Sequence, residues 1–158
     1  REVRELARQR RMTGTFVKSC FDLAFALAEA GDREAAKVAA AEGREYLKKE
    51  LGSRSASCQN LIILGQLEAV SGKTSEAKQY LSKALIIGAK DPYTLQNLSE
   101  LYALLGDKTQ AIETLKKALE SGFRDYFFPV IMPAYQSIRN EPQFRALFKL
   151  DAKEKKSE

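Results

Sequence analysis

The chain has 158 residues, of which 44% are hydrophobic and 30% charged, an ordinary composition for a globular domain. Its 26 basic and 21 acidic residues give a net charge of +5, a weak excess that solvated helix surface explains without a nucleic-acid partner. Histidine is absent, which removes the usual imidazole base and one of the usual zinc ligands, and no apolar run approaches the roughly 20 residues of a membrane span.

Residues 1–16 are basic at their start, and they lack the apolar core of a signal peptide. The chain opens on Arg1 rather than on methionine. We therefore expect residues 1–16 to be a basic helix or a linker that continues from a longer parent chain.

Residues 17–57 carry small and apolar residues at helical spacing, and Gly52 marks the expected stop of a helix. The segment is a looser copy of a unit that recurs twice downstream. Its Ala36 precedes the matching Ala77 by 41 residues, whereas the downstream copies are 34 residues apart. We assign the additional length to Leu51–Ser57, as an extended helix and a loop.

Residues 58–91 and 92–125 are the clear copies of this unit. The letters GKTSEAKQYLSKALIIG recur 34 residues later as GDKTQAIETLKKALESG. Within each copy the apolar spacing is helical and a glycine separates two runs, which predicts two antiparallel helices joined by a short turn. Ala77 and Ala111 leave room for a close helix crossing. One such pair cannot cover its own apolar faces, so the pairs should stack.

Residues 126–150 break the pattern. Pro129 and Pro133 interrupt any regular helix, so we expect short helices here. A stack of helix pairs needs a cap over its last apolar face, and this segment follows the last pair directly. We therefore predict a helical cap over 126–150, followed by a polar tail over 151–158.

A 34-residue helix-turn-helix unit with small residues at its eighth, twentieth and twenty-seventh places resembles the tetratricopeptide repeat. The residues that carry the resemblance are Leu61, Leu64, Gly65, Ala77, Leu81 and Ala84, then Leu95, Leu98, Ser99, Tyr102, Ala111, Leu115 and Ala118. Glu68 departs from the pattern, which has an aromatic residue there. Residues 133–147 resemble the closing segment of tetratricopeptide regions attached to bacterial serine/threonine kinases, cyclases and transcription regulators. The resemblance implies an all-α, right-handed solenoid of three helix pairs with a helical C-terminal cap.

In that family the second, fifth and ninth places of each repeat line a concave groove that binds a peptide or helix. By position, the resemblance places nine residues in the groove: Lys18, Phe21, Phe25, Gln59, Ile62, Gln66, Tyr93, Gln96 and Glu100. The apolar members favour a partner that inserts apolar side chains. The alternative is that Phe21 and Phe25 pack against residues 1–11 and are never accessible.

The resemblance implies a non-catalytic module, scaffolding or regulatory, with a protein or peptide partner. The sequence carries no phosphate-binding glycine loop, and we expect no cofactor, no metal and no catalytic residues. One rival function is a regulatory segment of a signalling enzyme that packs against another domain of its own parent chain. The other is a nucleic-acid-binding helical repeat, for which the predicted groove is too apolar. We expect no specific nucleic-acid partner, no membrane span and a cytoplasmic location.

Overall fold

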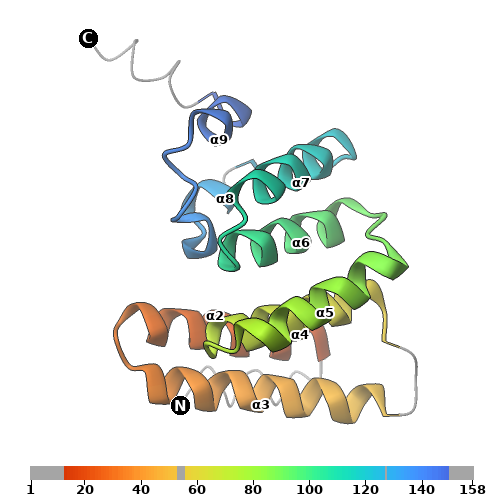
Figure 1. The fold of residues 1–158 in the computed structure, drawn as a ribbon, viewed down its shortest axis with the longest axis vertical. Coiled ribbons are helices and arrows are strands. Elements are labelled where there is room, and N and C mark those ends of the chain that lie inside the picture. The colour runs from red at the N-terminus through yellow and green to blue at the C-terminus, as the bar shows by residue number, and fades with distance from the viewer. Residues whose placement is uncertain (1–12, 53–55, 127, 150–158) are drawn as a thin grey trace. The chain divides into compact units, whose positions relative to one another are not determined.

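The structure, a computed structural model, describes residues 13–52, 56–126 and 128–149. Within these ranges every regular element is a helix, so the all-α prediction is confirmed (Figure 1). The chain forms two compact units, residues 1–89 and 90–158. Most of the predicted N-terminal segment and all of the predicted polar tail lie outside the described residues. The right-handed superhelix through all three pairs stays a prediction.

The first unit contains two helix pairs. Its helices are α2 (Thr13–Glu29), α3 (Arg33–Leu51), α4 (Cys58–Val70) and α5 (Thr74–Ile87). The helix α2 packs on α3, and α4 packs on α5 and also contacts α2 and α3. Two consecutive pairs are therefore stacked within this unit, as the repeat pattern predicted.

The ends of the first pair differ in how well the sequence placed them. The helix α2 begins at Thr13, inside the segment that we had assigned to a separate N-terminal helix or linker. The added turn is held by the core, because Phe16 is buried and its ring lies 4.5 Å from that of Tyr46 on α3, measured between centroids. The helix α3 ends at Leu51 with Gly52 as its C-cap, at the predicted stop.

The second unit contains the third pair and the C-terminal segment. Its elements are α6 (Pro92–Leu104), α7 (Lys108–Glu120), α8 (Phe128–Ile131), the 3₁₀ helix η1 (Pro133–Tyr135) and α9 (Pro142–Leu147). The helix α6 packs on α7, while η1 contacts α6 and α9 contacts α7. The helices after α7 are short, as the prolines predicted. Tyr135, Ile138 and Phe144 are completely buried, so this segment adds its own core to the unit.

The same turn follows the first helix of all three pairs. In each turn a backbone N–H donates to the carbonyl five residues earlier, over 2.9 to 3.0 Å: Asp32 to Leu27, Lys73 to Glu68, and Asp107 to Tyr102. The preceding glycine has a positive φ, for example 79° at Gly72 and 80° at Gly106, as this helix-ending motif requires. Because the first pair contains the same turn, the looser copy is a structural repeat of the other two.

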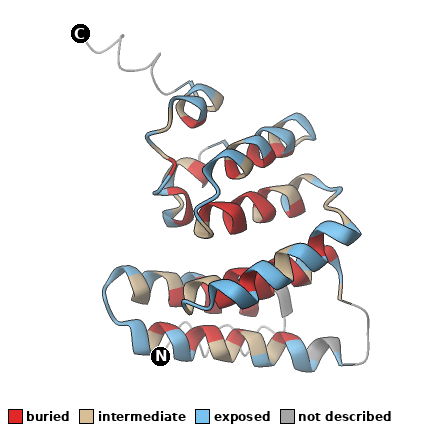
Figure 2. Cartoon of the chain, viewed as in Figure 1, coloured by how far each residue is buried: buried red, intermediate tan, exposed pale blue. Residues whose placement is uncertain are grey.

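The small residues of the pattern lie where the paired helices cross. Ala36, Ala77 and Ala111 are buried at equivalent places in α3, α5 and α7. A Cβ atom on Gly43 of α3 would lie only 2.8 Å from Cys20 Cβ of α2, so the two backbones approach too closely there for alanine. Figure 2 shows that burial is most continuous along α4 and α6, the first helices of the second and third pairs.

Candidate partner-binding surface

The six predicted groove residues of the first unit lie on α2 and α4, and they divide by accessibility. The buried members are Phe21, Ile62 and Gln66. The accessible members are Lys18 and Phe25, which are half-buried, and Gln59, which is exposed. A partner that leaves the unit unchanged can reach only the second set. The first set lies inside the unit as part of its packing.

The accessible part of α2 is an aromatic side chain beside a cation. The Lys18 Nζ atom lies 4.5 Å from the centroid of the Phe21 ring and 3.3 Å from Asp22 Oδ1. The rings of Phe21 and Phe25 are tilted with their centroids 6.2 Å apart, within the range of favourable aromatic pairs. Buried Phe21 therefore supports half-buried Phe25 from below. The alternative prediction, in which both rings pack against residues 1–11, lies outside the described residues.

Tyr93 is the accessible groove residue of the second unit, with 65% of its surface exposed at the start of α6. Its ring meets the buried Phe123 ring edge-on, with centroids 5.5 Å apart. The first turn of α6 is firmly capped, because Asp91 Oδ1 accepts a hydrogen bond from the Thr94 N–H at 2.9 Å. Hydrogen bonding from Thr94 lowers the pKa of Asp91 below its ordinary value. The cap and Phe123 together hold an exposed aromatic ring in place.

Gln96 and Glu100 lie under the C-terminal segment. The Tyr135 hydroxyl of η1 donates to the Gln96 backbone carbonyl at 3.2 Å, and Gln96 Nε2 donates to Glu100 Oε1 at 2.7 Å. All three residues are buried. Burial raises the pKa of Tyr135 far above its ordinary value, and the nearby Glu100 carboxylate adds to the effect. Within this unit, the chain itself occupies the surface of α6 around these two residues.

Residues 92–121, which span α6 and α7, match the family model of the tetratricopeptide repeat. This chain is a tetratricopeptide-repeat protein. The first two helix pairs lie outside the matched residues but share the turn and the buried small residues of the third. No curated protein matches the chain. A tetratricopeptide repeat indicates a protein–protein interaction module.

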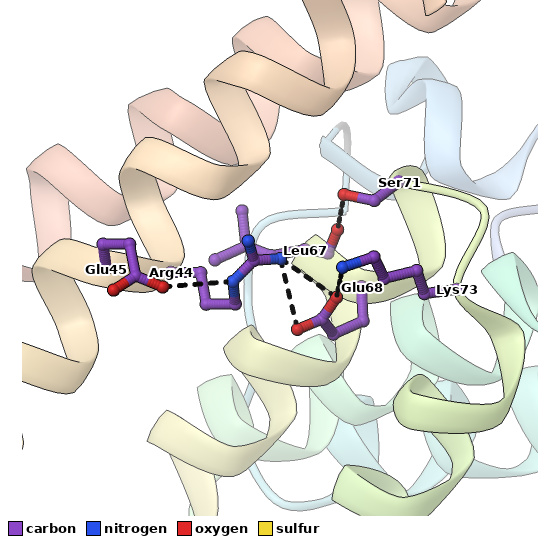
Figure 3. Close-up of polar contacts among 6 residues, drawn as sticks. All are labelled: Arg44, Glu45, Leu67, Glu68, Ser71 and Lys73. Carbon is purple, nitrogen blue, oxygen red and sulfur yellow. Dashed lines mark hydrogen bonds and ion pairs between the residues drawn. The ribbon is translucent and has the colours of Figure 1, made fainter. Parts of the chain in front are cut away.

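The departure from the repeat pattern at Glu68 has a structural explanation that the sequence analysis missed. Glu68 is buried on α4, and its carboxylate accepts hydrogen bonds from Arg44 Nη1 of α3 at 3.1 and 3.3 Å (Figure 3). The Lys73 Nζ atom, from the turn after α4, lies 3.8 Å away. The charged cluster of Arg44, Glu68 and Lys73 therefore joins the first repeat to the second. The one sequence signal was a carboxylate in register with Tyr102, at a place that the pattern buries.

Two further classes of site can be addressed in the described part of the chain. There, no group of three or more His, Cys, Asp or Glu side chains is arranged to hold a metal ion. Among the same residues, no helix has the length and apolar content that crossing a membrane requires. The accessible surfaces around Phe25 and Tyr93 are thus the leading candidates for partner contact.

Proposed function

We propose that this tetratricopeptide-repeat protein is a non-catalytic interaction module that binds a peptide or helix of a protein partner through apolar side chains. The observation that carries the proposal is Tyr93. It is a large aromatic residue, mostly exposed, at the second place of the repeat that matches the family.

Tyr93 has the properties of a strong contact residue. Tyrosine is enriched among the residues that dominate interface energies, because it offers a large apolar face and loses little conformational entropy on binding. Here the edge-on contact with Phe123 restricts the ring further before any partner arrives. A partner that covers Tyr93 would therefore gain apolar burial at a low cost in side-chain ordering.

The first unit supplies a second, separate contact. Phe25 is half-buried on α2, with the Lys18 cation nearby and the exposed Gln59 on the neighbouring α4. An aromatic anchor flanked by a cation and an amide suits an amphipathic helix or an extended segment. We assign the second-unit contact to Tyr93 rather than to Gln96 and Glu100, which Tyr135 covers.

The test compares Tyr93→Ala with Lys116→Ala. Lys116 lies on α7 of the same unit and forms only an exposed contact with Glu120 at 3.9 Å. Proteins captured from a lysate by the wild-type chain are identified, and the affinity of the strongest one is then measured for each variant. Tyr93→Ala should weaken it about thirtyfold, near 2 kcal/mol, and Lys116→Ala should leave it nearly unchanged.

Melting temperatures separate a lost contact from a lost fold. Both variants should melt close to the wild type, because both side chains are mostly exposed. Equal affinity of the two variants for the partner would remove Tyr93 from the binding surface. The companion change Phe25→Ala addresses the first unit, and a protein that unfolds on this change would show that Phe25 acts in packing instead.

A further inference from the structure

The C-terminal end of α5 exposes three consecutive aliphatic residues. Leu85, Ile86 and Ile87 are 49%, 86% and 48% exposed. Successive residues of an α-helix point about 100° apart, so the three side chains spread around the helix end with Ile86 at the crest. They form a convex apolar ridge, which we call the isoleucine ridge, and not a groove.

The repeat itself does not require this ridge. The 34-residue register aligns Ile86 with Glu120 and Ile87 with Ser121 at the end of α7, and both of those residues are exposed. A repeat of this chain therefore forms its second helix with polar residues at both places. Exposed isoleucines carry an unfavourable hydration cost, and the comparison shows that packing of the repeat does not explain them.

The charge around the ridge is positive. Residues 77–90 contain Lys78, Lys83 and Lys90 and no acidic residue, and all three lysines are exposed. The corresponding stretch at the end of the third pair, residues 111–124, contains Glu113 and Glu120. Lysines around an exposed aliphatic side chain combine the two contributions that attach a protein to an anionic membrane surface.

We propose that the isoleucine ridge docks on the surface of an anionic phospholipid bilayer, with Ile86 entering the interface and the three lysines facing the headgroups. The convex shape favours this occupant, since a fluid bilayer needs no preformed pocket to receive a ridge. A second copy of the chain fits less well. A stable interface takes about 20 to 30 residues a side, and two such ridges would bring lysines together.

A tryptophan reporter tests the proposal directly, because the chain contains no tryptophan of its own. Ile86→Trp places the reporter on the ridge. Val38→Trp is the control, on α3 of the same unit, at a position that is 58% exposed. Vesicles of phosphatidylcholine with phosphatidylglycerol should shift the emission of the Ile86→Trp protein to shorter wavelength and leave that of the Val38→Trp protein unchanged. Vesicles of phosphatidylcholine alone should shift neither.

Sedimentation with the same vesicles tests the wild-type side chains. The variant Ile86→Glu/Ile87→Ser copies the end of α7, and Val38→Glu makes the same change in net charge elsewhere. We expect the double variant to bind at least tenfold more weakly, about 1.4 kcal/mol, and Val38→Glu to bind within about threefold of the wild type. Raising the salt from about 50 to 200 mM should weaken wild-type binding.

Other occupants of the ridge give different results, each of which overturns the proposal. Blue-shifted emission from dilute Ile86→Trp protein without vesicles would show that the chain covers the ridge itself. A shift that grows with protein concentration alone would indicate a second copy. Equal sedimentation of the wild type and the double variant would show that the lipid is bound elsewhere. A lipid-independent loss of the Tyr93 partner in the double variant would assign the ridge to that protein.

Discussion

Removing the Arg44 guanidinium should destabilise the first unit far more than removing any exposed cation. Arg44→Met keeps the aliphatic stem and leaves the buried Glu68 carboxylate with only Lys73, at 3.8 Å, from the charged cluster. Breaking a buried pair by deleting one partner costs about 3 to 5 kcal/mol, because the remaining charge stays out of water. Since Lys73 remains and Arg44 keeps 15% side-chain exposure, we expect the lower end, about 3 kcal/mol.

The double substitution separates the cost of an unpaired charge from the value of the pair. Arg44→Met/Glu68→Leu replaces both partners with apolar side chains, an exchange that is often neutral or stabilising for buried pairs. We expect its stability to lie within about 1 kcal/mol of the wild type. Glu68→Leu alone should cost less than Arg44→Met alone, because the freed arginine can extend toward solvent.

The assay is urea unfolding followed by far-ultraviolet circular dichroism, with Lys37→Met as the control. Lys37 lies on the same helix and has a shorter contact, 2.7 Å to Glu34, but both side chains are mostly exposed. Its loss should cost less than about 0.5 kcal/mol. If Arg44→Met costs no more than Lys37→Met, burial does not control the strength of the pair and the reasoning is wrong.

Three further outcomes can be measured. Ala111→Leu overfills the crossing of α6 and α7, where Ala111 is wholly buried, and should cost about 1 to 3 kcal/mol; an unchanged melting temperature would contradict the repeat register. Above about pH 10 an unfolded tyrosine ionises while buried Tyr135 keeps its proton, so stability should fall as pH rises, and Tyr135→Phe should make that fall shallower. Any nucleic-acid binding should be independent of sequence and disappear between about 50 and 200 mM salt, and tight sequence-specific binding in gel-shift assays at the higher salt would refute this.

The helix pairs and their turns could be predicted from the sequence because their signals are local. A glycine that ends one helix and alanines at a fixed spacing in the next specify the same unit wherever they occur. Even the looser first copy follows these signals, through Ala36 and the turn at Gly31. The start of α2 could not be placed in this way, since the contact of Phe16 with Tyr46 joins residues 30 positions apart.

The charged cluster was hidden for a related reason. Register shows that Glu68 occupies a core position, but the pattern does not show which cation reaches it. Arg44 lies 24 residues earlier, on a helix of the preceding pair, at a place that the repeat signature leaves open. A carboxylate in a buried place is a signal that a partner exists, because an unpaired buried charge is too costly to persist. The partner itself is a property of how the pairs stack.

The predicted groove shows most clearly what a repeat register can and cannot specify. Register fixes the direction in which a side chain leaves its helix, so it correctly groups Gln96 and Glu100 on one side of α6. It is silent on what lies opposite, and here that is Tyr135, some 39 residues from Gln96 and outside the repeated unit. The C-terminal segment carries no copy of the repeat, so its contacts follow from its own prolines and aromatic residues. Accessibility, and with it the choice of Tyr93 over its two neighbours in the groove, is therefore set by the part of the sequence that does not repeat.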